Sequence, residues 1–415
     1  MTELTDLKKC TGCQACRLIC PERCISFKAD GEGFLVPDID QSLCTDCGLC
    51  VSRCPANNSA GKQGDGWEKE GDCSSVFYPR FLGAKLKDSA LLSRSASGGV
   101  FAGIASKVLK TQRSVVFGCA FDDNLTARHT YVIDIKDITP LQSSKYVQSD
   151  VGDTYLQVKS FLDDENTVFY TGVPCQIAGL YTFLGGDHEN LLTADLICHG
   201  VPSPLLFRRY LDWLGGKYGG EIVYYDFRSK EINGWSITTK IKTGTKTRTI
   251  DRRVDPYVNS FLNELTFREC CYTCRYANCH RVADITFGDF WGVENTHPEF
   301  YSSKGVSVVL INTKKGEHIF KILEDEFDTI ETKPENVLRR NRNLQEPSPR
   351  PKARDTAYDG VGDEKKEIFK SPVFKIDTKT LLITYIKKGV KLIIPSPAID
   401  IYRKAKRKLN KNSVV

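Results

Sequence analysis

Two copies of one cysteine motif constrain this chain more than any other feature. CTGCQACRLICP begins at Cys10 and CTDCGLCVSRCP begins at Cys44, and each copy reads Cys-x2-Cys-x2-Cys-x3-Cys-Pro. In two-cluster ferredoxins, three closely spaced thiolates of one copy and the distal Cys of the other copy hold each [4Fe–4S] cluster. The spacing therefore predicts two ligand sets, namely Cys10, Cys13, Cys16 and Cys54 for one cluster, and Cys44, Cys47, Cys50 and Cys20 for the second.

A pair of tetrahedral zinc sites is the alternative interpretation of these motifs, because paired CxxC units also form zinc ribbons. Two complete copies of the longer spacing, each followed by proline, favour the clusters over zinc. Cys24 matches no ligand position, so we expect a buried free thiol there. Between the copies, alternating residues around Gly31 and Gly33 predict a β-hairpin.

The use of cysteine also indicates a cellular compartment. Nine of the 17 cysteines lie within residues 10–54, and no apolar signal region precedes them. Reduced thiols in such dense groups are typical of metal sites in the cytoplasm rather than of disulfides. The most apolar run, LLITYI at 381–386, is too short to span a bilayer. We therefore expect a cytoplasmic protein.

The 415 residues predict several domains of the α+β or α/β class. Apolar runs typical of strands occur at 115–121, 167–172, 191–197 and 282–288, and helical patterns occur at 98–110 and 204–214. Ser203 and Pro204 are a typical helix start. The expected organisation is a ferredoxin-like domain at 1–55, a Gly-rich linker at 56–73, a mixed α/β core at 74–346 and a polar, basic extension at 347–415.

Two motifs in the core suggest cofactor binding without requiring it. SRSASGGVF at 93–101 places small residues directly before a helix, an arrangement that suits a phosphate but is also an ordinary helix cap. SSKYVQSD at 143–150 offers the cation of Lys145 and the ring of Tyr146, although a solvated loop would look the same. These residues alone leave both interpretations open.

A second group of cysteines lies in the core. Cys175 follows one strand pattern, Cys198 ends another, and Cys271 with Cys274 forms a CxxC. Cys175 and Cys198 could be core residues, or a nucleophile with His199 as its base. Zinc is a further alternative, with Cys271, Cys274, Cys279 and His280 as ligands. A third cluster is the most economical hypothesis, because the chain already carries two.

The order of these motifs resembles that of a known family. SASGGVF, SSKYVQS, GVPCQIAGL, the Cys of LICHG, CYTC and RVADITFGDFWG are similar to the coenzyme F-420 hydrogenase/dehydrogenase beta-subunit family over roughly residues 75–345. The resemblance implies a flavin-binding core with FAD and a third [4Fe–4S] cluster. The implied cluster ligands are Cys175, Cys198, Cys271 and Cys274. The residues expected at the flavin are Ser97, Gly98, Gly99, Lys145 and Asp289. The extra Cys270 and Cys279 depart from the family pattern.

The expected function is an FAD-dependent iron–sulfur oxidoreductase. Clusters carry single electrons, and a flavin exchanges them for hydrides. Electrons would pass between ferredoxin or another redox partner, the clusters, FAD and a small molecule or deazaflavin carrier. GDFWG and FRSKEINGW are most similar to bacterial relatives, some of them associated with surface-polysaccharide synthesis. The competing hypothesis is a non-catalytic electron-transfer subunit of a larger complex. No catalytic residue is predicted, and no nucleic-acid partner is expected.

The C-terminal end is strongly basic. Nine lysines and arginines lie between residues 387 and 411, against the single acidic residue Asp400. A basic helix there would allow peripheral contact with an anionic membrane surface, at the inner face of the membrane. A solvated end is the alternative and the one favoured by the small apolar face.

Overall fold

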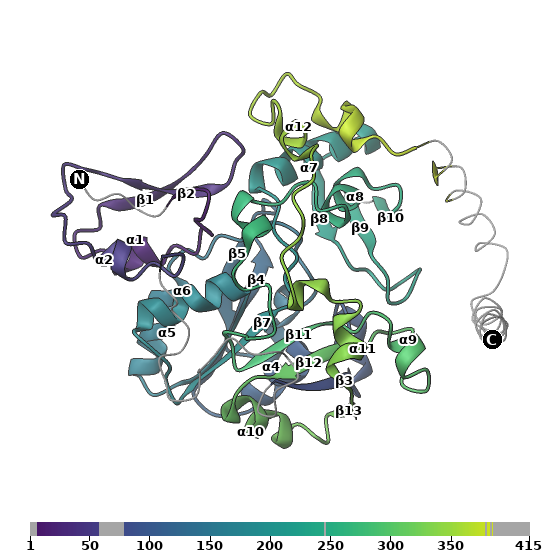
Figure 1. The fold of residues 1–415 in the computed structure, drawn as a ribbon. Coiled ribbons are helices and arrows are strands. Elements are labelled where there is room, and N and C mark those ends of the chain that lie inside the picture. The colour runs from purple at the N-terminus through teal and green to yellow at the C-terminus, as the bar shows by residue number, and fades with distance from the viewer. Residues whose placement is uncertain (1–5, 58–78, 245, 378–379, 382–383, 385–415) are drawn as a thin grey trace.

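The computed structural model describes residues 6–57, 79–244, 246–377, 380–381 and 384. The chain begins with a small ferredoxin-like module, drawn in purple in Figure 1. The hairpin predicted around Gly31 and Gly33 is confirmed, and Ile25 lies opposite Ile39. The elements of this module are α1 (Ala15–Ile19), β1 (Ile25–Ala29), β2 (Leu35–Ile39) and α2 (Leu49–Ser52).

A mixed eight-stranded sheet forms the centre of the core. Its strands are β3 (Arg80–Leu86), β4 (Ser114–Phe121), β5 (Ala127–Val132), β6 (Thr167–Gly172), β7 (Leu191–Leu196), β11 (Ile285–Asp289), β12 (Ser307–Ile311) and β13 (Phe327–Glu331). The order is β13-β3-β12-β11-β7-β6-β4-β5. The four predicted strands are β4, β6, β7 and β11, and these are the neighbours that run parallel. Parallel strands bury both faces, which explains their continuous apolar runs.

Helices cover both faces of this sheet, which makes three layers. Side chains of α4 and α10 pack on one face with Val116 and Phe169, while α5 and α6 pack on the other face with Val115 and Val168. The helices of the core are α3 (Ser89–Arg94), α4 (Val100–Val108), α5 (Thr154–Asp163), α6 (Pro174–Leu184), α7 (Pro204–Tyr218), α8 (Pro256–Leu262), α9 (Val293–Thr296), α10 (Lys314–Ile322) and α11 (Pro334–Leu338). Ser203 caps α7 by accepting from the Leu206 amide, as its sequence predicts.

A second, smaller sheet lies beside α7 and α8. Its strands are β8 (Ile222–Asp226), β9 (Thr238–Thr243) and β10 (Lys246–Asp251), in the antiparallel order β10-β9-β8. Short 3-10 turns occur at η1 (Ile135–Asp137), η2 (Thr139–Leu141), η3 (Glu269–Thr273), η4 (Arg342–Leu344), η5 (Ile368–Lys370) and η6 (Pro372–Phe374).

The segment after residue 346 differs from the polar extension expected there. It forms α12 (Arg354–Tyr358) and then η5 and η6, drawn in yellow near α7 in Figure 1. Tyr358, Phe369 and Phe374 are buried in the same hydrophobic cluster as the apolar face of α7. Residues 347–377 therefore belong to the folded core, because aromatic side chains spaced along a polar segment are enough to anchor it.

The ferredoxin module packs tightly against the core. Gly33 allows the closest approach, since a Cβ there would lie 2.1 Å from the Cβ of Leu205 at the start of α7. The Phe34 and Tyr358 rings lie with their centroids 5.5 Å apart. Arg354, 2% exposed, binds Glu32 through both of its terminal nitrogens. The C-terminal segment therefore holds the module in place.

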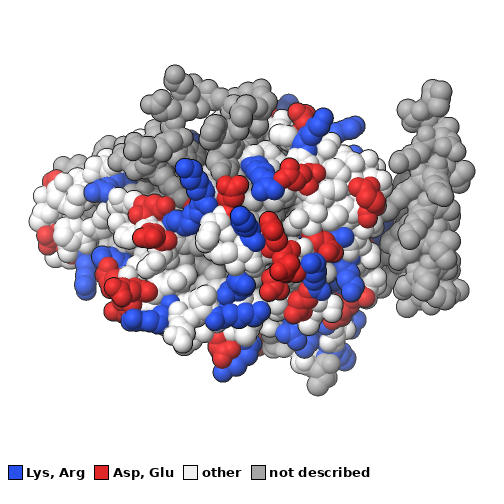
Figure 2. Space-filling view, turned by 90° about the horizontal axis from the view of Figure 1, so that it is seen from below, with Lys and Arg blue, Asp and Glu red and all other residues white. Residues whose placement is uncertain are grey.

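The linker expected at 56–73 falls almost wholly, and the basic tail entirely, outside the described residues, so neither expectation is tested. Within the part of the chain that the structure describes, every helix is too short or too polar to cross a bilayer. Acidic and basic side chains are interspersed over the face shown in Figure 2.

Candidate iron–sulfur and cofactor sites

The first predicted ligand set lines one small cavity of the module. Cys10, Cys13 and Cys16 come from the loop that leads into α1, and Cys54 arrives from the end of α2. Phe27, Pro37 and Pro55 close the cavity with apolar surface. Burial raises the pKa of the Cys13 thiol to about 12. Four thiols in an apolar shell are the donor set that a [4Fe–4S] cluster requires.

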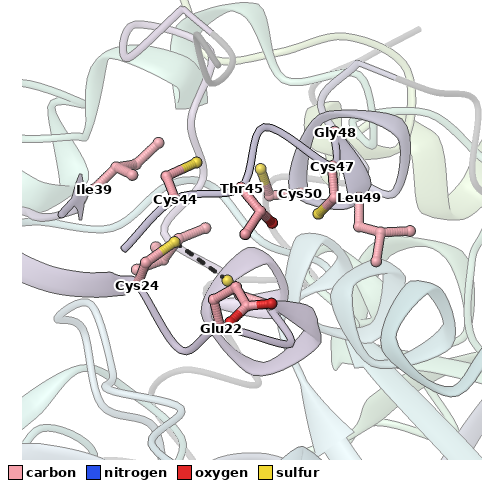
Figure 3. A pocket seen from close by; sticks show the side chains of 11 residues that line it. Glu22, Cys24, Ile39, Cys44, Thr45, Cys47, Gly48, Leu49 and Cys50 are labelled. Carbon is pink, nitrogen blue, oxygen red and sulfur yellow. Dashed lines mark hydrogen bonds between the residues drawn. The ribbon is translucent and has the colours of Figure 1, made fainter. Parts of the chain in front are cut away.

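The second predicted set lines a separate cavity, shown in Figure 3. Cys44, Cys47 and Cys50 surround it, and Cys20 reaches it from the C-terminal end of α1. Cys24 is buried, as expected, but it lines the same cavity, and its Sγ lies 3.4 Å from that of Cys20. The distal cysteine of each motif copy therefore lines the cavity formed by the other copy: Cys20 lies at the second cavity and Cys54 at the first.

A third group of cysteines lines a cavity of about 1150 Å³ in the core. Cys175 lies in the first turn of α6, Cys198 follows β7, and Cys271 and Cys274 lie at η3. Burial raises the pKa of Cys198 to about 12, and the charge of the neighbouring Cys274 adds to this effect. Cys119 and Cys270 line the same cavity, so six thiols rather than the predicted four lie in its wall.

Two features of the described residues bear on the zinc alternatives. Among the described residues, no three His, Cys, Asp or Glu side chains lie close enough together to hold one metal ion. Cys279 and His280, which the core zinc hypothesis needs, are not among the described residues that line the large cavity. A cluster is larger than an ion, so thiols spaced around a cavity suit a cluster better.

The residues expected at the flavin meet in the large cavity, with one exception. Ser97, Gly99, Lys145 and Asp289 line it. Gly98 is not among its described lining residues: its amide donates to Ser307 Oγ at 2.9 Å, and a Cβ would lie 2.2 Å from the Ala84 carbonyl oxygen. Gly98 is therefore needed so that the loop before α4 can pack on β3 and β12.

Lys145 is a partly desolvated cation in the cavity wall. Its Nζ donates to the carbonyl oxygens of Pro140 and Gln142, both at 2.8 Å. Burial lowers the pKa of Lys145 to about 8. A third carbonyl oxygen, that of Ser143, lies 3.4 Å from Nζ, so main-chain acceptors hold the amine in the cavity wall.

Asp289, delivered by the end of β11, is held by Arg228. The two guanidinium nitrogens donate to its carboxylate oxygens at 2.7 and 2.9 Å, and Trp235 Nε1 donates at 2.6 Å. The guanidinium holds the pKa of Asp289 below its usual range. Arg228 also donates to the carbonyl oxygen of Ala96, so the pair fixes the SASGG segment beside β11.

Arg228 and Gln142 are site residues that the sequence motifs do not identify. Both are buried and line the cavity. Within the described chain, Arg228 Nε and Gln142 Oε1 have no hydrogen-bond partner. Arg228 lies in FRSKEINGW, directly after the residues that form β8. A charged residue at the end of a strand was the one sign in the sequence that could have pointed to a site residue here. Its pairing with Asp289, 61 residues away, depends on the tertiary fold.

The resemblance inferred from the motifs is confirmed by comparison with known families. Residues 165–336 match the family model for the C terminus of the beta subunit of coenzyme F420 hydrogenase/dehydrogenase. Residues 9–58 match the 4Fe-4S dicluster domain. The eight predicted cluster ligands of the module fall in the second match, and the core cysteines and Asp289 fall in the first. Ser97 to Gly99 and Lys145 precede it.

Two similar proteins add detail. The pyruvate synthase subunit PorD of Methanothermobacter marburgensis is 38% identical over 50 residues, which are 12% of this chain and 52% of that subunit. The chain thus spans about half the length of this curated relative. A chain from the F420-reducing [NiFe] hydrogenase complex of Methanosarcina barkeri, studied by xenon derivatization, is 18% identical with a TM-score of 0.46. That alignment covers 66% of this chain and 92% of the other.

Proposed function

We propose that this chain, which joins a 4Fe-4S dicluster domain to a domain similar to the C terminus of the F420 hydrogenase/dehydrogenase beta subunit, is an iron–sulfur flavoprotein oxidoreductase. Cys175, Cys198, Cys271 and Cys274 would hold a third [4Fe–4S] cluster, beside the two ferredoxin-type clusters of the module. The clusters would supply one-electron transfer, and bound FAD would supply its exchange, in either direction, with a small molecule or a deazaflavin carrier.

One observation carries this proposal. A single cavity of about 1150 Å³ is lined both by the core cysteines and by four of the five residues expected at the flavin. This volume is larger than most sites for small ligands, so the cavity has room for a cofactor together with a substrate. A cluster beside such a cavity is placed to exchange electrons with whatever the cavity binds.

The chemistry of the cavity wall suits FAD. Gly99 is the N-cap residue of α4, and no side chain caps the first turn, so the amide groups of this turn are available to a phosphate. The orphaned atoms Gln142 Oε1 and Arg228 Nε require polar partners. Ser97, Gly99, Lys145 and Asp289 would hold the cofactor, with Gly98 behind the wall. Bound FAD would supply the exchange between single electrons and hydride.

Contacts between the three cysteine groups support one order for the relay. Cys47, in the second ligand set, is exposed to solvent. Cys13, in the first set, packs against α6, where a Cβ at Gly179 would lie 3.1 Å from its Sγ. The charge of Cys13 also contributes to raising the pKa of the Cys175 thiol. The proposed order is therefore second set, first set, core set.

The substrate is proposed at the level of its class. The similarity of GDFWG and FRSKEINGW to bacterial relatives favours a small molecule of surface-polysaccharide synthesis over the deazaflavin carrier. Ferredoxin or a similar one-electron protein is the proposed partner. The reaction belongs in the cytoplasm, where thiolate ligands stay reduced.

Anaerobic purification followed by cofactor extraction tests the proposal. We expect about 12 iron atoms and a similar amount of sulfide per chain, because each [4Fe–4S] cluster contains four irons, together with one FAD. A protein saturated near eight irons would remove the third cluster from the proposal, and a protein that takes up no flavin on reconstitution would remove FAD.

A non-catalytic electron-transfer subunit is the second candidate. It is favoured by the match to PorD, which is a subunit of a larger enzyme by name. The two candidates differ in a direct assay. If the purified chain with a chemical reductant converts a small molecule or deazaflavin without a partner, it is an enzyme. If it passes electrons only to a co-purifying protein, it is a subunit.

A further inference from the structure

Arg268 is a buried arginine between the ferredoxin module and the core, with 3% of its surface exposed. Its Nε donates to the carbonyl oxygen of Cys10 at 2.7 Å, and its Nη1 donates to that of Leu35 at 2.9 Å. The positive charge of Arg268 also opposes the rise in the pKa of the Cys10 and Cys270 thiols. Arg268 therefore lies between Cys10, a predicted ligand of the first cluster, and the large core cavity, whose wall it helps to form.

The charge of Arg268 has no carboxylate beside it in the part of the chain that the structure describes. Its other contacts are neutral, namely Gln148 Oε1 at 3.3 Å and the Phe34 ring at 5.4 Å. Three further arginines are similarly buried, and each one faces a carboxylate. These pairs are Arg228 with Asp289, Arg281 with Asp195, and Arg354 with Glu32.

A buried charge is unfavourable unless an opposite charge lies beside it. The ionisable acidic groups that the structure places at this arginine are two thiols, Cys10 of the first ligand set and Cys270 of the core. Of these two, only Cys10 is a predicted cluster ligand, and its carbonyl oxygen accepts a hydrogen bond from Arg268. A [4Fe–4S] cluster with four thiolate ligands carries net negative charge, and its charge becomes more negative on reduction. A cluster at Cys10 would therefore supply the anion that the other three arginines find in a carboxylate.

We propose that Arg268 is the counter-charge of the cluster held by Cys10, Cys13, Cys16 and Cys54, and that it raises the reduction potential of this cluster. The cluster takes one electron from a one-electron donor protein, and no bond forms or breaks. The fixed positive charge stabilises the reduced state more than the oxidised state. Arg268 is a positioning residue that acts through the cluster, and the inference rests on loading of this ligand set but not on the flavin.

Redox titration of the full-length, anaerobically purified protein tests this, with the clusters followed by electron paramagnetic resonance. Arg268→Gln should make one of the cluster potentials more negative, with an equilibrium constant for reduction at least tenfold lower, which is about 59 mV for a one-electron couple. Arg268→Lys keeps the charge and should recover most of that shift. The remaining potentials should move much less.

Arg354→Gln is the matched control, because it removes a buried arginine from the same interface but one that pairs with Glu32. It should weaken docking of the module and leave the potentials in place. If Arg268→Gln and Arg268→Lys have equal effects, or if no potential moves, Arg268 only ties the module to the core and the proposal is overturned.

If Arg268→Gln does not fold, the same redox titration is carried out on Arg268→Met, which keeps the apolar part of the side chain but removes its charge. Iron and sulfide analysis of the wild-type protein separates this inference from the proposed function. A wild-type chain without iron at the first ligand set would overturn both. A full complement of clusters with an unmoved potential would overturn the role of Arg268 alone, and a missing flavin would not affect it.

Discussion

Cys20 and Cys54 are the residues that join the two halves of the ferredoxin module. Each is the distal cysteine of one motif copy, and each lines the cavity of the other copy. The motif spacing predicted this arrangement, because in two-cluster ferredoxins each cluster takes its fourth ligand from the other motif copy. Cys24 shows the limit of spacing arguments, since the sequence could not reveal that it lies 3.4 Å from Cys20.

Replacing a distal cysteine should therefore empty the cavity of the other motif copy. We expect Cys20→Ser to lose about four iron atoms per chain, the content of one cluster, while Cys10, Cys13, Cys16 and Cys54 keep theirs. Cys24→Ala is the control at the neighbouring thiol and should keep all of its iron. Equal losses from both variants in iron and sulfide analysis would contradict the assignment of Cys20 as the ligand.

Lys145 predicts a measurable pH dependence of stability. Burial lowers its pKa to about 8, whereas an unfolded lysine titrates near about 10.4. Between these values the unfolded chain binds more protons, so the contribution of Lys145 to stability rises with pH. The free energy of unfolding of the wild type, relative to that of Lys145→Met, should therefore rise by about 2 kcal/mol from pH 8 to pH 10, as measured by thermal unfolding.

The constant effect of losing the Lys145 hydrogen bonds does not alter this trend, because only the change with pH is compared. Lys321→Met, on the exposed side of α10, is the matched control for replacing a lysine by methionine. A difference between the wild type and Lys145→Met that stays flat from pH 7 to pH 10 would show that Lys145 titrates normally.

At the scale of single elements, α6 connects the module to the cavity. Its first turn carries Cys175, and Gly179, one turn later, packs on Cys13 of the first ligand set. The sequence predicts where some elements begin, as Ser203 and Pro204 do for α7. It does not predict which side chain faces a helical glycine, because that depends on how distant segments pack.

Gly179→Ala tests this contact against helix propensity. Alanine favours helices over glycine by about 1 kcal/mol, but a Cβ here would lie 3.0 Å from the Cβ of Cys13, so overpacking should cost about 1–3 kcal/mol. Gly216→Ala in α7 is the matched control, since its Cβ would meet nothing within 4 Å. We expect opposite signs in thermal unfolding, with iron lost more readily from Gly179→Ala. Stabilisation by both changes would contradict the contact.

At the scale of the whole molecule, the described parts of module, core and C-terminal segment form one packed unit. The sequence identifies the module from its cysteines and the central strands from their apolar runs. It does not identify residues 347–377 as core, because Tyr358, Phe369 and Phe374 are separated by polar residues and become a hydrophobic cluster only beside α7. The pairing of Arg354 with Glu32 is equally invisible in the sequence.

Truncation tests the role of this segment. A chain ending at Glu346 would expose the cluster that Tyr358, Phe369 and Phe374 complete, so we expect it to aggregate or to lose cooperative unfolding. A chain ending at Pro395 keeps all of the described residues and should retain the clusters and the fold. Size-exclusion chromatography and thermal unfolding of the two chains make the comparison. A well-folded chain ending at Glu346 would show that 347–377 is dispensable.

The ion pair between Glu32 and Arg354 also has a consequence for synthesis of the chain. These residues are 322 positions apart. At about 5–20 residues per second, a ribosome needs about 15–65 s to travel between them. During that interval the newly made module lacks the segment that later clamps it. The loop that carries Cys10 and Cys13 is then open to the cellular machinery that delivers iron and sulfide, before docking packs it against Arg268 and α6.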